Sequence, residues 1–247
     1  MNETATQTNN QNKGYSTFGE YFKEVVYGGV DGIVTTFAIV SGFSGAALSS
    51  DITAQASFAI VLLFGLANLF ADAISMGLGN FLSVRSEKDQ YEILRAKEKS
   101  LMEQYPENEI LETVSILKDK GFDEVDARSL AAMYQKNEEY WLDFMMSHEH
   151  ERSDPRGDNP VLTGLATFGS FLIFGVIPIL PFLLLGESSS ALLFQISAGG
   201  TFIALVILGL MKWRIVGTGL WRSLIEIVLI GSVAAVIAFA VGTFFKL

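Results

Sequence analysis

Long runs of apolar residues alternate with polar segments along this chain. Five runs are long and mostly apolar, at 28–48, 58–82, 161–185, 191–211 and 224–245. A helix needs about 20 mostly apolar residues to cross a bilayer. The pattern therefore predicts an all-α integral membrane protein with five transmembrane helices.

The pattern changes between the second and third runs, where charged residues are frequent and the apolar positions suit short helices. Pro106 is expected in the first turn of a helix, Gly121 at a helix end, and Asp123 at a cap. These signals predict a small helical domain at 83–159. It is inserted between transmembrane helices two and three.

The remaining segments complete the domain organisation. Residues 1–16 are rich in Asn, Thr and Gln and are expected to form a disordered tail. Residues 17–82 hold the first two spans, preceded by a short amphipathic segment that begins near Phe18. That segment fits an interfacial helix and fits equally well a simple extension of the first span. Residues 160–247 hold helices three to five, with a kink expected at Pro178.

Composition and charge divide the chain in the same way. Half of the 247 residues are hydrophobic, the mean hydropathy is +0.37, and the net charge is −10. Residues 85–158 alone hold 19 acidic and 11 basic residues, a net charge of −8. Basic residues in short loops mark the cytosolic side of a membrane. The amino terminus and the 83–159 domain are therefore expected in the cytosol and the carboxyl terminus outside.

Polar side chains inside the first two spans need an explanation, because a charge in a bilayer costs several kcal/mol. In the first span, Asp31 and Thr35 lie four residues apart. The second span carries a stripe in which each member is four residues from the next: Asn68, Asp72, Met76 and Asn80. The stripe predicts a pathway for an ion, and the alternative is hydrogen bonding that holds helices together. A carboxylate with a thioether suits a borderline divalent metal.

Three separated blocks of the chain resemble one known family. The first is 31–34 (DGIV) followed by 37–38 (FA) and 41–46 (SGFSGA), the second is 73–79 (AISMGLG) running on to 86–87 (SE), and the third is 141–146 (WLDFMM). These blocks look like those of the vacuolar iron transporter family, in the same order and over about residues 25–247. The layout of five spans with a cytosolic metal-binding domain is also similar.

The resemblance implies a homodimer that exchanges cytosolic Fe²⁺ for protons along a pathway between the paired first and second spans. Asp31 matches the intramembrane aspartate of the family, and Met76 matches its pathway methionine. A family glutamate two turns before that methionine corresponds here to Asn68. Asp72 supplies a carboxylate one turn away on the same stripe.

The resemblance also implies metal ligands in the cytosolic domain. The positions that match are Glu98, Glu109, Glu112, Met145, Met146 and Glu149. A partner expected for Glu98 is replaced by Leu101, and Glu103 is the nearest substitute. His148 and His150 are additional candidate ligands that the family does not predict. The alternative interpretation is that these acidic residues are simply solvated on helix surfaces.

The sequence therefore predicts a transporter that exports Fe²⁺ in exchange for protons, for metal detoxification or storage. Mn²⁺ is a rival substrate, and a membrane-anchored iron sensor or buffer is a rival function. We expect no prosthetic group, with the metal as substrate, and no enzymatic activity, since no nucleophile–base pair or phosphate loop is visible. Membrane lipid, divalent metals and protons are the expected partners, and the acidic soluble part argues against nucleic acid.

Two compartments fit these features. Short loops and the absence of a visible signal peptide favour a bacterial inner membrane, whereas the family resemblance offers a vacuolar membrane as the alternative. The chain has no cysteine, which excludes structural disulfides and thiolate metal ligands.

Overall fold

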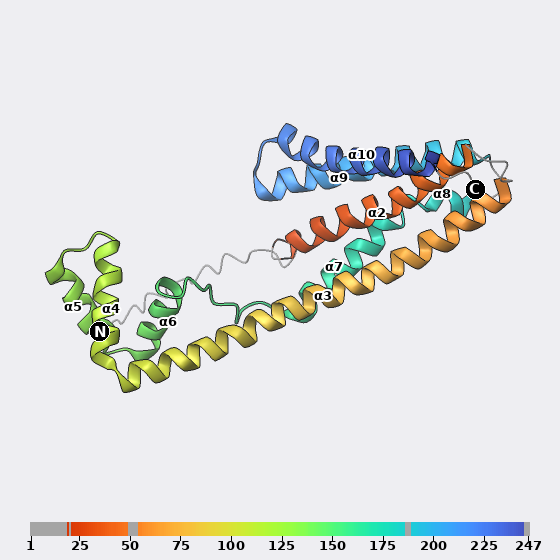
Figure 1. Cartoon of the computed structure of the whole chain (residues 1–247). Helices are drawn as coiled ribbons and strands as arrows, with labels where there is room; N and C mark the ends of the chain where they lie inside the picture. The colour runs from red at the N-terminus through yellow and green to blue at the C-terminus, as the bar shows by residue number, and fades with distance from the viewer. Residues whose placement is uncertain (1–18, 20, 49–53, 186–188, 245–247) are drawn as a thin grey trace, which may run out of the picture. The chain divides into compact units, whose positions relative to one another are not determined.

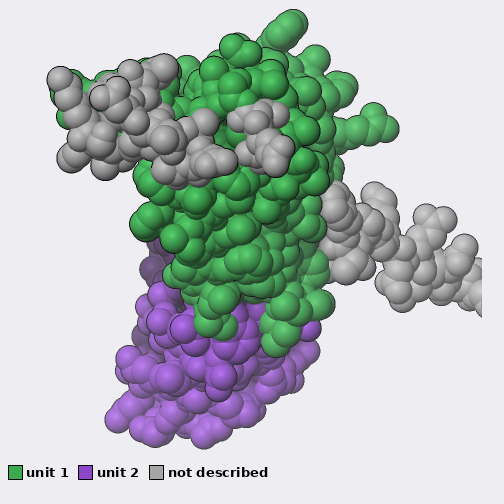
Figure 2. Space-filling model, turned by 90° about the vertical axis from the view of Figure 1, so that its right-hand side faces the viewer, with its two compact units in different colours: residues 1–80, 161–247 green, residues 81–160 purple. Residues whose placement is uncertain are grey.

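A computed structural model describes residues 19, 21–48, 54–185 and 189–244, and every regular element within these ranges is a helix (Figure 1). In chain order the helices are α2 (Phe22–Leu48), α3 (Ala54–Gln104), α4 (Pro106–Asp119), α5 (Glu124–Tyr134), α6 (Glu138–His148), α7 (Pro160–Gly175), α8 (Leu180–Leu184), α9 (Ser190–Val216) and α10 (Leu220–Phe244). The chain forms two compact units (Figure 2). Unit 1 comprises residues 1–80 and 161–247, and unit 2 comprises residues 81–160.

Four of the described helices are long and apolar enough to cross a membrane: Phe22–Ala46, Phe58–Gln104, Ser190–Val216 and Leu220–Phe244. The predicted third span is instead divided into α7, of 16 residues, and α8, of five. The chain turns between them, where the Ile179 amide donates to the Val176 carbonyl at 3.0 Å. Pro178 lies in this turn, and proline cannot supply the backbone donor that a continuous helix needs. The structure thus shows four long helices and one broken apolar segment.

Unit 1 is held together by close contact between helix backbones. A Cβ atom on Gly242 of α10 would collide with the carbonyl oxygen of Gly42 on α2, and one on Gly45 of α2 would collide with that of Phe239. In lipid there is little hydrophobic drive between helices, so small residues that allow dense packing stabilise the contact. These glycines therefore allow α2 to pack closely against α10.

Unit 2 folds around a core that α3, α4, α5 and α6 share. Its buried members include Tyr91, Met102, Val114, Leu117, Trp141, Leu142, Met145 and Met146. Local signals set the helix boundaries as expected. Pro106 begins α4, Gly121 follows α4 with a φ of 100°, and the Asp123 carboxylate accepts the Asp126 amide at 2.9 Å. An Asx cap of this kind satisfies an amide that has no partner within the helix.

Two predictions concern the start of the chain. The expected tail at 1–16, and Thr17, Phe18 and Glu20 of the expected interfacial helix, lie outside the described residues. From Phe22 onward the amphipathic segment is part of α2, with no break before residue 28.

Candidate functional site

The polar stripe of α3 makes two kinds of contact. The Asn68 side-chain amide donates to the Asp72 carboxylate at 2.6 Å, one turn further along the same helix. The Asn80 amide donates across to the Thr167 hydroxyl of α7 at 2.7 Å. Asn80 therefore joins two helices, which is the alternative that the sequence left open for it. Met76 is partly buried and packs against an apolar cluster that includes Phe171.

The carboxylate of α2 lies near the stripe. An electrostatic interaction links the Asp31 carboxylate of α2 with the Asp72 carboxylate of α3. Asp31 is half-buried. Thr35 does not extend this polar group, because its hydroxyl donates to the backbone carbonyl of Asp31 at 2.8 Å.

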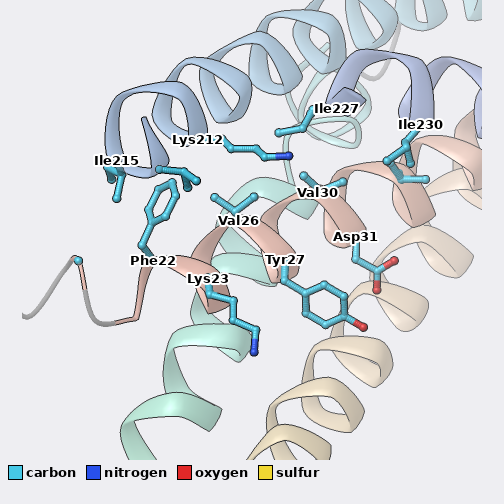
Figure 3. A pocket seen from close by; sticks show the side chains of 13 residues that line it. Phe22, Lys23, Val26, Tyr27, Val30, Asp31, Lys212, Ile215, Ile227 and Ile230 are labelled. Atoms are coloured by element: carbon cyan, nitrogen blue, oxygen red, sulfur yellow. The ribbon is translucent and has the colours of Figure 1, made fainter. Parts of the chain in front are cut away.

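A cavity of about 690 Å³ opens beside Asp31. Its walls come from α2, α9 and α10 and are mostly apolar, including Val26, Val30 and Ile227. Figure 3 shows Lys23, Tyr27 and Asp31 projecting from the same side of α2. The sequence interpretation did not include Lys23 or Tyr27. Lys23 lies eight residues before Asp31 and Tyr27 four, and this helical spacing was the signal that could have identified them.

In unit 2 the fold gathers five candidate ligands into two overlapping groups. Glu98, Glu149 and His150 form one group, and Glu109, Glu112 and Glu149 form the other. Within each group one ligand atom from every residue lies within 4.8 Å of the others. Glu149 belongs to both, so two ions bound there would be neighbours that share its carboxylate.

Burial makes these carboxylates unusual. Glu98 is 1% exposed and Glu109 is 6% exposed. One oxygen each of Glu98, Glu109 and Glu149 has no hydrogen-bond partner among the described residues. A buried, unpaired carboxylate is costly unless it takes up a proton or a cation.

Burial and the closeness of these carboxylates also change their pKa values. Burial, followed by repulsion from Glu98, raises the pKa of Glu109 from 4.5 to about 7. Burial and then Glu98 likewise raise the pKa of Glu149. A metal ion in this position would compete with protons for the same oxygens.

Four other predicted ligands lie outside the two groups. Met145 and Met146 are fully buried in the core of unit 2, and the Met145 sulfur lies 3.3 Å from the Thr113 hydroxyl. Glu103 is exposed on α3. His148 stacks on the Phe144 ring at a centroid distance of 4.4 Å, with its Nδ1 3.0 Å from the Phe144 carbonyl oxygen.

Long apolar helices that carry carboxylates, combined with a unit that gathers buried acidic ligands, are typical of a membrane protein that transports cations. Comparison with known proteins gives the family: the sequence model of the VIT family matches residues 22–243, and the chain belongs to this family. Family membership agrees with the expectation of a transporter and not an enzyme.

The named relatives cover nearly the whole chain. It is 35% identical to the "Vacuolar iron transporter" of Toxoplasma gondii over an alignment of 242 residues that covers 94% of this chain and 76% of that protein. It is 31% identical to the "Vacuolar iron transporter 1" of Arabidopsis thaliana, over 97% of this chain and 92% of the relative. The protein with the same name in Oryza sativa subsp. japonica is also 31% identical, over 92% of this chain and 86% of its own length.

Proposed function

We propose that this chain transports Fe²⁺ across a membrane in exchange for protons. The observation that carries the proposal is the electrostatic interaction between two carboxylates, Asp31 and Asp72, inside the apolar unit of a chain whose relatives are named iron transporters. Two carboxylates close together in such surroundings need a compensating positive charge. A divalent cation supplies that charge in one step of the cycle, and protons supply it in the other.

The charge distribution supports export from the cytosol as the direction of transport. Unit 2 holds most of the acidic residues, and a net negative surface raises the local concentration of cations. With the amino terminus and unit 2 on the cytosolic side, metal is collected there and exported for storage or detoxification. Five crossings, the third made by α7 and α8 together, place the carboxyl terminus on the opposite side.

The pathway lies between α2 and α3, with Asp31, Asp72, Asn68 and Met76 as the groups that contact the ion. Two copies of the chain pair their α2 and α3 helices around it. The relatives' names favour a vacuolar membrane over the bacterial inner membrane that the loops suggested. Hard carboxylates also accept Mn²⁺, so Mn²⁺ is the natural competitor for Fe²⁺.

Flux through proteoliposomes tests the proposal. The purified chain should take up Fe²⁺ when a proton gradient is imposed, and the uptake should carry protons in the opposite direction. Asp31→Asn removes one carboxylate of the pair and should reduce the initial rate at least tenfold, because the ion loses a charged ligand in a poorly solvated site.

Asp119→Asn is the matched control, since it makes the same chemical change at an exposed position of α4 and should leave the rate unaltered. Fe²⁺ binding without flux would replace the transporter by an iron sensor or buffer. Undiminished flux through Asp31→Asn would remove the carboxylate pair from the mechanism. Competition by Mn²⁺ in the same vesicles gives the preference between the two ions.

A further inference from the structure

The Glu98–Glu149–His150 group differs from the other group of unit 2 in one ligand. The His150 Nε2 lies 3.0 Å from the Glu98 carboxylate and 3.8 Å from the Glu149 carboxylate. The second group, Glu109, Glu112 and Glu149, offers only oxygen. We propose that His150 is a metal ligand and that its nitrogen makes the first group prefer Fe²⁺ over Mn²⁺. This inference deepens the proposed function and takes Fe²⁺ from it as the substrate.

Geometry favours a ligand over a simple hydrogen bond. Atoms bound to one ion at about 2.1 Å lie at most about 4.2 Å apart, so the three side chains need only small movements to share an ion. The hydrogen bond to His150 satisfies one oxygen of Glu98 and leaves the other oxygen buried and unpartnered. A cation between the three groups would compensate the charge of Glu98, which is 1% exposed.

The backbone after α6 is arranged to place this histidine. Helix α6 ends at His148, and the Arg152 amide donates back to the Met146 carbonyl at 3.0 Å. Between them Glu151 adopts a φ of 51°, a left-handed conformation that favours glycine. A non-glycine residue held in this region marks a locally strained cap. Within this cap, the His150 ring reaches the carboxylate of Glu98 on α3, 52 residues away in the sequence.

Ligand chemistry supplies the selectivity. Affinity for a given site rises from Mn²⁺ to Fe²⁺, and imidazole suits iron, whereas carboxylate and carbonyl oxygens suit manganese. Replacing an oxygen ligand by nitrogen therefore strengthens Fe²⁺ binding more than Mn²⁺ binding. The position that the family resemblance assigns to a second acidic partner of Glu98 holds Leu101, and His150 provides the missing ligand from the segment that follows α6.

The test measures competitive Fe²⁺ and Mn²⁺ binding to the full-length chain in detergent, by anaerobic equilibrium dialysis at fixed pH. His150→Ala should lower the affinity of this group for Fe²⁺ about tenfold or more and its affinity for Mn²⁺ less. His150→Glu should keep metal binding but reduce the preference for Fe²⁺. His148→Ala is the matched control, because His148 is a neighbouring histidine that belongs to neither group, and it should change neither affinity.

A spectroscopic measurement separates a ligand from a structural residue. Pulsed electron paramagnetic resonance of Mn²⁺ bound to the full chain should show coupling to a nitrogen nucleus, which disappears in His150→Ala and persists in His148→Ala. Absence of this coupling in the unmodified chain at a Mn²⁺ concentration that fills both groups overturns the assignment, even if His150→Ala fails to fold. Equal losses for both ions overturn the selectivity.

The outcome is separable from that of the proposed function. If the chain transports Fe²⁺ and its preference for Fe²⁺ over Mn²⁺ is unchanged in the His150 variants, only this inference is overturned. A preference that depends on His150, in a chain that shows no flux, supports the ligand and overturns transport.

Discussion

Glu109 is surrounded by like charges in a buried position, and its protonation contributes to the stability of unit 2. Burial raises its pKa most, and repulsion from Glu98, Glu149 and Glu112 raises it further. The folded state therefore binds this proton more tightly than the unfolded state. Stability linked to the proton is fully present below about pH 4.5 and is lost as the pH rises through about 7.

We accordingly expect the metal-free protein to unfold at a lower temperature at about pH 8 than at about pH 5.5. Glu109→Gln keeps the shape without the ionisation and should flatten this dependence, whereas Glu107→Gln, at an exposed position of the same helix, should not. This pH dependence is measured by thermal unfolding of the full chain, monitored by circular dichroism with and without metal. A dependence that survives in Glu109→Gln would assign the proton to another group.

At the scale of elements, the contact between α2 and α10 depends on glycine. The carbonyl oxygen of Gly42 occupies the space that a side chain on Gly242 would need, and it belongs to backbone that cannot swing aside. Helices that approach this closely tolerate larger residues only by moving apart.

Gly242→Leu should therefore lower the free energy of unfolding of unit 1 by about 2 kcal/mol or more. Gly199→Leu on α9 introduces the same side chain where an added Cβ meets no atom within 4 Å, and it should have a small effect. Unfolding of both variants by denaturant in detergent gives the comparison. Equal stability of the two variants would mean that the α2–α10 contact does not limit the fold.

At the scale of the whole molecule, the proposed mechanism divides the work between the two units. The acidic groups of unit 2 collect metal, and the carboxylates of unit 1 conduct it. Loss of a metal ligand in unit 2 should weaken the apparent affinity for Fe²⁺ more than it lowers the maximal rate of uptake, because the pathway in unit 1 remains intact.

Glu149→Gln affects both ligand groups at once and should raise the Fe²⁺ concentration at half-maximal uptake about tenfold while the maximal rate changes little. Asp126→Asn, at an exposed position on α5, is the control for the loss of one negative charge. Initial rates in proteoliposomes over a range of Fe²⁺ concentrations give both quantities. A fall in maximal rate at unchanged half-saturation would place Glu149 in the translocation step itself.

Local features of the fold could be predicted from the sequence because neighbouring residues cause them. Pro106, Gly121 and Asp123 act through the backbone within one turn, and each occupies the position expected for it. The stripe on α3 is also local, since a spacing of four residues fixes a common face. At the third apolar run the sequence predicted a kink at Pro178, whereas the structure divides the run into two separate helices, α7 and α8. Its outcome depends on partners such as the Ser197 hydroxyl, which donates to the Pro178 carbonyl at 2.7 Å.

The candidate site likewise divides into features that the sequence predicts and features that depend on helix packing. By itself the sequence determined the membrane class, the acidic inserted domain, the family and the residue types that could bind metal, because hydropathy, charge and spacing are properties of the chain. Only the tertiary structure decided which of those residues meet. His150 joins Glu98 while its neighbour His148 stacks on Phe144, and Met145 turns its sulfur toward Thr113. The physical reason is that a metal site depends on distances of a few ångströms between helices, and helix packing sets those distances.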